Sequence, residues 1–192
     1  MAASIISGFQ RCFTMDSFAL FTDMSLNPML KLGVGCYLLV PDSFLEVSPE
    51  NIEKTEVAER LILRRFEAAS SSELEVLTAL WAFEDCRDKL KAFCPLKLRL
   101  YTDSQCIAGL LKRRTGLEAG GFLSRKTKLP LKNAFLYRSF YEFHDELGFE
   151  VAKVKGHTRS CSRDTVHSIF SFIDREERKA LKLWIKEFES KY

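Results

Sequence analysis

Hydrophobic and polar residues follow two different periods along this chain, and the change of period predicts where strands and helices lie. Five short stretches are apolar or alternate between apolar and polar residues, with turn-forming residues at their ends, which is typical of strands. The predicted strands cover residues 18–23, 33–40, 60–66, 96–102 and 149–154. Four longer stretches repeat apolar residues every three or four positions, which is typical of helices. The predicted helices cover residues 71–93, 103–114, 130–147 and 166–191.

The order of these elements predicts an α/β fold. Three strands come first, and helices then alternate with the last two strands. A strand meander followed by right-handed crossovers gives a five-stranded mixed sheet, three strands antiparallel and two parallel, flanked by helices. We expect the fourth strand to lie beside the first. The charged segment 46–59 is predicted to be a solvated connection, residues 1–17 an N-terminal arm and residues 18–192 one domain.

The composition limits the class of protein. With 192 residues, of which 46% are hydrophobic, the chain can bury one sizeable core. The net charge of +3 does not by itself require a nucleic-acid partner. The six cysteines form no CxxC pair, so neither a zinc site nor a disulfide framework is expected, and the protein is predicted to be intracellular and cytoplasmic. The sequence does not reveal the oligomeric state, for which a monomer is the expectation.

The first residues and the longest apolar stretches bear on targeting. The N-terminal segment lacks the basic start and apolar run of a secretory signal, although an organelle-targeting arm stays open as an alternative. No apolar stretch reaches the length of a membrane span, so no membrane partner is expected.

Acidic residues mark the ends of two predicted strands. Asp23 closes the first strand and Asp103 follows the fourth, each within a Thr-Asp pair. If these strands pair in parallel, the two acids lie side by side, and Glu73 in the first turn of the intervening helix can reach the same crevice. Converging carboxylates raise one another's pKa values, and a divalent cation relieves the repulsion. Such oxygen ligands favour Mg²⁺ or Mn²⁺ over zinc. Asp103 alone could equally be a helix cap.

Four short motifs occur in the same order as in a known family. They are Phe21-Thr22-Asp23-Met24-Ser25 with Asn27, Ser72-Glu73-Leu74, Tyr101-Thr102-Asp103-Ser104-Gln105 and Val154-Lys155-Gly156-His157. Together with the order of the predicted elements, these motifs make the chain resemble the ribonuclease H type 1 family over about residues 18–182. The resemblance implies a ribonuclease H-like fold.

The resemblance also implies a metal-binding active site. Asp23, Glu73 and Asp103 correspond to metal-binding acids of the family, and a fourth acid is expected on or before the last helix. Asp174 is preferred, because the apolar stripe of its helix can pack on the sheet. Asp164 stays the alternative.

Further residues are implied to move protons or to contact the substrate. His157 corresponds to the family's loop histidine, and an imidazole beside a metal-bound water is suited to proton transfer. A loop histidine that only makes local hydrogen bonds is the other interpretation. The predicted nucleic-acid contacts near the acids are Ser25, Asn27, Ser72 and Gln105.

A basic cluster supplies more candidate contacts to nucleic acid. It includes residues 112–114, 125–128 and Lys132, and its position corresponds to the basic region of the family. Cations on a solvated surface are the alternative interpretation. The predicted contacts within the cluster are Arg113, Arg114, Lys126 and Lys128.

The implied activity is an endonuclease that hydrolyses the RNA strand of RNA/DNA hybrids with two Mg²⁺ or Mn²⁺ ions and no small-molecule cofactor. Two departures from the family concern the substrate more than the metal site. Met24 stands where the family usually has glycine, and serines 70–72 replace the usual asparagine pair. The alternatives are a catalytically silent nucleic-acid- or protein-binding module of the same fold, and a nuclease for another nucleic acid.

Overall fold

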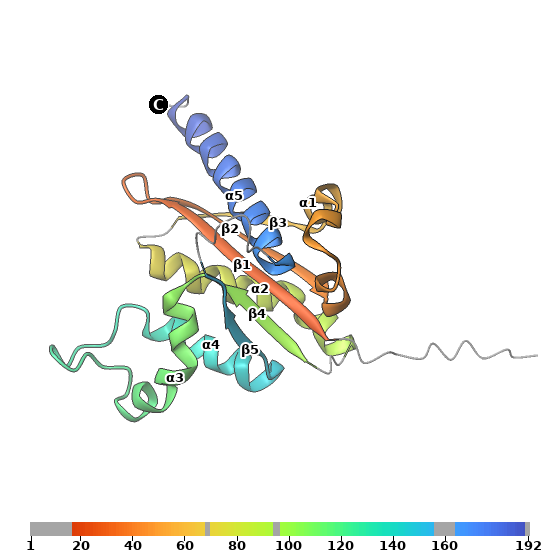
Figure 1. Ribbon diagram of the computed structural model, residues 1–192. Helices are drawn as coiled ribbons and strands as arrows, with labels where there is room; N and C mark the ends of the chain where they lie inside the picture. Colours follow the sequence, from red (N-terminus) through yellow and green to blue (C-terminus); the bar gives the residue numbers. More distant parts are fainter. Residues whose placement is uncertain (1–16, 68–69, 94–96, 156–163, 191–192) are drawn as a thin grey trace, which may run out of the picture.

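The computed structural model of this chain describes residues 17–67, 70–93, 97–155 and 164–190. Figure 1 shows one twisted sheet with helices around it. The strands are β1 (Phe18–Asn27), β2 (Leu32–Pro41), β3 (Ile62–Glu67), β4 (Leu98–Thr102) and β5 (Glu150–Lys153). The helices are α1 (Lys54–Arg60), α2 (Ser71–Phe93), α3 (Gln105–Ala119), α4 (Ala134–Leu147) and α5 (Thr165–Glu189), and short 3₁₀ turns cover Asp42–Leu45 and Pro49–Asn51.

The five strands form a mixed sheet in the order β3-β2-β1-β4-β5. The pairs β1–β2 and β2–β3 are antiparallel, whereas β1–β4 and β4–β5 are parallel. The predicted α/β fold is therefore confirmed, including the place of the fourth strand beside the first. The two edges are β5 and β3, and β3 carries the adjacent arginines Arg64 and Arg65.

Side chains of the central strands alternate between two faces, and each face has its own apolar core. Helix α5 crosses one face over β1 and β2, where Phe21 and Tyr101 stack with ring centroids 4.9 Å apart. Helix α2 lies on the other face and packs against α4, with the buried ring of Phe83 at the centre of an aromatic cluster. Burying one such ring contributes about 1.5–3 kcal/mol, which is why these faces hold the helices in place.

Two glycines of β2 allow α2 to approach the sheet closely. A Cβ atom at Gly35 would lie 2.2 Å from Thr78 Oγ1, and one at Gly33 would lie 2.4 Å from Leu74 Cδ2. Real Cβ atoms do not approach other atoms so closely, so any other residue would displace the Thr78 or Leu74 side chain or the helix that carries it. The contact therefore fixes both the distance and the rotation of α2 relative to the sheet.

Helix α4 begins at Ala134, four residues after its predicted start, and the structure differs from the predicted elements in three further places. The segment 46–59, expected to be a solvated connection, contains the second 3₁₀ turn and most of α1, which buries only Val57. Helix α3 continues to Ala119, five residues beyond its predicted end, because Gly116 lies within the helix. Strand β1 continues to Asn27, because its antiparallel pairing with β2 extends to the hairpin turn.

The ends of the chain leave part of the domain prediction untested. The predicted N-terminal arm lies outside the described residues except for Ser17, whose carbonyl accepts a hydrogen bond from Asp42 N. None of the described helices is long and apolar enough to cross a lipid bilayer.

Candidate metal centre

Asp23 and Asp103 lie where the parallel pairing of β1 and β4 ends. Phe21 stands opposite Tyr101 at the last pair of this ladder, and each acid follows two residues later. A step of two residues along a strand returns to the same face, so Asp23 projects on the face that α5 covers. Asp103 immediately follows β4, and α3 begins at Gln105.

Ser104, and not Asp103, caps helix α3. Its hydroxyl oxygen accepts a hydrogen bond from Ile107 N at 3.1 Å. The same hydroxyl donates to Glu75 Oε2 at 2.7 Å. One serine thus begins α3 and holds a carboxylate of α2, which leaves Asp103 available for other contacts.

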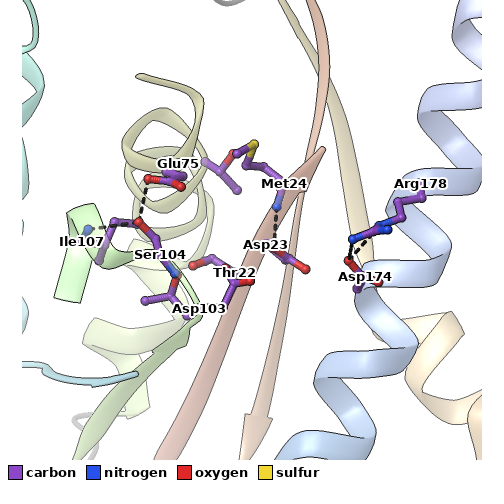
Figure 2. A pocket seen from close by; sticks show the side chains of 11 residues that line it. Thr22, Asp23, Met24, Glu75, Asp103, Ser104, Ile107, Asp174 and Arg178 are labelled. Atoms are coloured by element: carbon purple, nitrogen blue, oxygen red, sulfur yellow. Dashed lines mark hydrogen bonds and ion pairs between the residues drawn. The ribbon is translucent and has the colours of Figure 1, made fainter. Parts of the chain in front are cut away.

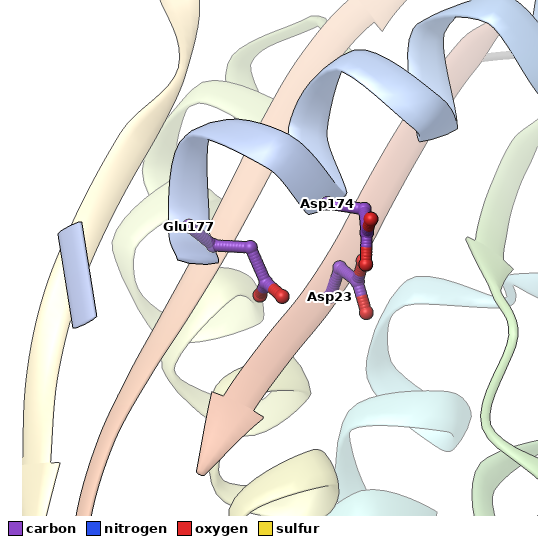
Figure 3. A group of neighbouring side chains, drawn as sticks. All are labelled: Asp23, Asp174 and Glu177. Atoms are coloured by element: carbon purple, nitrogen blue, oxygen red, sulfur yellow. The ribbon is translucent and has the colours of Figure 1, made fainter. Parts of the chain in front are cut away.

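Helix α5 contributes Asp174, Glu177 and Arg178. The guanidinium of Arg178 donates to Asp174 Oδ1 through Nε at 2.8 Å and lies 2.7 Å from it through its terminal nitrogen. Glu177, one helical turn beyond Ile173, is only 1% exposed. Asp23, Asp174 and Glu177 each offer an oxygen atom such that the three atoms lie within 4.8 Å of one another (Figure 3).

These elements enclose one acidic pocket of about 160 Å³ between the ends of the strands and the two helices (Figure 2). Four acids line it, from β1, α2, the β4–α3 junction and α5. Thr22 and Thr78 also line it, and their buried hydroxyl oxygens have no hydrogen-bond partner among the described residues. The lining residues are Thr22, Asp23, Met24, Glu75, Thr78, Thr102, Asp103, Ser104, Ile107, Asp174 and Arg178.

The acids of the pocket and its surroundings have raised pKa values. Burial raises the pKa of Asp23 to about 8, and the charge of Asp103 adds to the shift. The pKa of Asp103 is raised by burial and by Asp174, and that of Glu75 mainly by burial. Burial and then the charge of Asp23 raise the pKa of Glu177 to about 10. Without a cation the site therefore resists full ionisation.

Two examples illustrate the likeness of this chain to solved structures. The solution structure of the PFV RNase H domain has a TM-score of 0.58 and 15% sequence identity, and the match covers 88% of this chain and 95% of that chain. The foamy viral protease-reverse transcriptase in complex with dsDNA has a TM-score of 0.52 and 11% identity, over 81% and 90% of the two chains. The chain has a ribonuclease H-like fold. No protein family profile matches it, and no curated protein matches it significantly.

Within the ribonuclease H-like fold, three of the predicted acids meet and one does not. Asp23, Asp103 and Asp174 line the pocket. Glu73 is not among the lining residues, and its Oε2 lies 3.1 Å from Lys132 Nζ instead. Asp164, the alternative fourth acid, caps α5 by accepting a hydrogen bond from His167 N at 2.9 Å. His157 lies outside the described residues.

The predicted nucleic-acid contacts have varied surroundings. Ser25 and Ser72 are half-buried, whereas Asn27 Oδ1 accepts hydrogen bonds from Met29 N and Leu30 N and so shapes the β1–β2 turn. Gln105 accepts a hydrogen bond from Lys153. These residues stay predictions as substrate contacts.

Some side chains of the basic cluster form hydrogen bonds or ion pairs within the chain, and others are exposed. Arg113 donates to the carbonyl oxygens of Gly109 and Cys106, each at 3.1 Å. Arg114 forms ion pairs with Glu118 and Asp145. Lys126 and Lys128 are exposed in the segment between α3 and α4. Lys126 and Lys128 are therefore more accessible to a polyanion than Arg113 and Arg114 are.

Sequence reasoning missed Glu75 and Glu177, although each left a signal. Glu75 precedes Thr78 and Ala79, which are buried against the sheet, so it lies on the inward side of α2. Glu177 stands midway between Ile173 and Leu181 at steps of four residues, so an acid interrupts the apolar stripe of α5. An acid in such a stripe is expensive to bury unless it has a partner.

The donor set fits a hard divalent cation. All four acids of the pocket offer carboxylate oxygens, which Mg²⁺ and Mn²⁺ prefer. Burial and the neighbouring Asp103 raise the pKa of Asp23, and a cation among these acids would favour its ionised form. The positive charge of Arg178 lies on the α5 side of the pocket, where it pairs with Asp174.

Proposed function

We propose that this protein is a metal-dependent endonuclease that hydrolyses the RNA strand of RNA/DNA hybrids by a two-metal-ion mechanism. The observation that carries the proposal is that Asp23, Glu75, Asp103 and Asp174, from four separate elements, line one pocket. Acids that raise one another's pKa values cost free energy, and binding of divalent cations offsets this cost. The ribonuclease H-like fold and the resemblance of the motifs to the type 1 family support the same activity.

The chain's own residues would divide the work as follows. Asp23 and Asp103 hold the ions from the ends of the paired strands, and Asp174 adds a ligand from α5. Glu75, fixed by the 2.7 Å hydrogen bond from Ser104, orients a water or a ribose hydroxyl. When bound, two ions activate a water and stabilise the leaving 3′-oxygen. His157 stays a prediction for proton transfer.

Arg178 is suited to contact the substrate. Its guanidinium now pairs with Asp174 at the pocket, at 2.7 Å. Once a cation neutralises Asp174, the guanidinium is free to donate to a phosphate oxygen, for which its planar fork of donors is well shaped.

A single set of assays tests the proposal. Labelled RNA/DNA hybrid, double-stranded RNA and duplex DNA are incubated with the protein in Mg²⁺, in Mn²⁺ and in EDTA. We expect internal cleavage of the RNA strand of the hybrid that requires the metal. Asp103→Asn should lower the rate at least about a hundredfold, since even partners outside the ligand shell cost about 10–100-fold. Asp88→Asn, which changes an exposed acid of α2, serves as the matched control.

The outcomes separate the alternatives. Cleavage of double-stranded RNA or duplex DNA in preference to the hybrid would assign another nuclease activity to the same site. Binding of the hybrid without cleavage in either metal would indicate a silent binding module and contradict the proposal. Cleavage that persists in Asp103→Asn would show that the pocket is not the active site.

A further inference from the structure

Glu177 is a buried carboxylate to which the proposed mechanism gives no role. It lies on the face of α5 that packs on β1 and β2, between the buried side chains of Ile173 and Leu181, and it is 1% exposed. Burying a carboxylate without compensation costs several kcal/mol. A hydrophobic residue would fill this position of the stripe at no such cost, so the acid needs a reason other than packing.

The contacts of Glu177 do not compensate its charge. Within the part of the chain that the structure describes, it forms no ion pair, and no oxygen or nitrogen donor hydrogen-bonds to its carboxylate. The Cys36 thiol lies 3.9 Å from Oε2, and a thiol is a weak donor. Arg178, its neighbour in sequence, points to Asp174 instead.

The carboxylate points toward two acids that are already assigned to the metal centre. Figure 3 shows Glu177 directed from α5 toward Asp23 and Asp174, and one oxygen of each lies within 4.8 Å of the others. Three oxygen atoms at such spacing can surround one cation after small rotations of the side chains. Asp103 and Glu75 do not belong to this tight group, so they lie toward the other side of the pocket.

A second observation concerns polar groups on the α2 side of the pocket. Thr22 and Thr78 are 2% and 1% exposed, both residues line the pocket, and their hydroxyl oxygens have no hydrogen-bond partner in the described chain. Buried hydroxyls are ordinarily satisfied by protein or by bound water. Hydrated cations bring waters that can donate to such oxygens.

Glu177 is not itself among the residues that line the pocket. We propose that it is a third protein ligand, with Asp23 and Asp174, of one divalent cation bound where these three acids converge. The inference rests on the proposed function, which makes this pocket a metal centre. What it adds is the set of residues that bind one of the ions. A third carboxylate adds negative charge to one of the two ion positions, so we expect the ion at this position to bind more tightly than the ion at the other. The carboxylate also replaces a water of the ion.

Binding of Mn²⁺ to the full chain tests the inference without any nucleic acid. Isothermal titration of the wild type is compared with Glu177→Gln, Glu177→Leu and the control Glu176→Gln. Glu176 is one residue away and pairs with Lys179 outside the group. We expect the two Glu177 variants to weaken the tighter binding step at least about tenfold, because loss of a partner outside the ligand shell already costs 10–100-fold. Glu176→Gln should bind as the wild type does.

A second readout distinguishes a ligand from a structural residue. Luminescence lifetimes of bound Tb³⁺ in H₂O and D₂O count the waters on the ion, and Glu177→Gln should add about one water, since oxygen ligands of the protein and water exchange places. Thermal unfolding in EDTA checks that the Glu177 variants fold, and the expected result is a cooperative transition close to that of the wild type.

The outcomes separate this inference from the proposed function. If both Glu177 variants bind Mn²⁺ with the affinity and water number of the wild type, and Asp23→Asn loses binding, the metal centre stands but Glu177 is not one of its ligands. No binding of Mn²⁺ by the wild type would overturn both. Binding that depends on Glu177, in a protein that cleaves no nucleic acid, would support the inference and contradict the proposed function.

Discussion

Glu73 and Glu75 carry the same charge in the first turns of α2 but have different surroundings. Glu75 lines the pocket and accepts a hydrogen bond from Ser104, whereas Glu73 lies 3.1 Å from Lys132. Two positions along a helix are about 200° apart around its axis, so the two side chains face different directions. Glu75 is therefore the one of these two acids that faces the pocket.

Exchanging each acid for its amide tests this distinction. Glu75→Gln should lower hybrid cleavage by about a hundredfold or more, because it removes a charge at the reacting centre. Glu73→Gln should leave the rate nearly unchanged and cost less than about 1 kcal/mol of stability, as expected for an exposed ion pair. Single-turnover cleavage and urea unfolding measure the two effects. Loss of activity in Glu73→Gln alone would reverse the assignment.

The raised pKa of Glu177 predicts how stability depends on pH in the absence of metal. The group ionises near 4.5 in the unfolded chain but only near pH 10 in the folded one. Between these values the folded state binds more protons, so this group lowers the free energy of unfolding as pH rises. Glu177→Gln has no ionisable group at this position, so its stability lacks this dependence on pH. In EDTA, its stability relative to the wild type should increase from pH 5 to pH 9, as measured by urea unfolding, and a constant difference would contradict the raised pKa of Glu177.

At the scale of elements, α2 is the helix whose position matters most for the site. Leu74 and Thr78 lie over Gly33 and Gly35, and this contact sets the direction in which Glu75 points. Sequence periodicity correctly predicted α2 and the strands that carry Asp23 and Asp103. It could not choose Glu75 over Glu73, because the rotation of the helix follows from packing on β2, far away in the sequence. It missed α1 because that helix buries a single residue, Val57, and shows no apolar period.

Substituting a glycine tests this close contact. Gly35→Ala would place a Cβ 2.2 Å from Thr78 Oγ1 and 3.0 Å from Phe66 Cε2. We expect a loss of about 1–3 kcal/mol of stability from overpacking and a fall in cleavage as Glu75 moves. Gly116→Ala is the matched control, because nothing lies within 4 Å of its added Cβ and helix propensity favours alanine by up to about 1 kcal/mol. Equal behaviour of the two variants would contradict the packing argument.

At the scale of the whole molecule, positive and negative charges are separated in a way that the net charge of +3 does not show. The acids gather in the pocket, while Lys126 and Lys128 are exposed in the segment between α3 and α4. Arg114, in contrast, is neutralised by Glu118 and Asp145. The lysines therefore offer a polyanion a contact surface separate from the acids.

The salt dependence of binding measures this contribution. If Lys126 and Lys128 each contact a phosphate, replacing both by alanine should weaken hybrid binding in Ca²⁺ and reduce the slope of log affinity against log salt by about 2. Arg114→Ala should chiefly lower stability, because it breaks two ion pairs. Fluorescence anisotropy at several salt concentrations gives the slopes. An unchanged slope in the double variant would exclude the two lysines as phosphate contacts.

The arginines on the edge strand β3 bear on how the protein behaves in solution. An open strand edge offers unpaired backbone groups to any other strand, and Ile62 and Leu63 are 41% and 42% exposed there. Arg64 lies over the rings of Phe66 and Trp81, and Arg65 lies over Trp184 and pairs with Glu187. Charged side chains on an edge strand oppose its pairing with a second copy of the same edge. We therefore expect replacement of Arg64 by a hydrophobic residue to make the chain more prone to edge-to-edge association at high concentration.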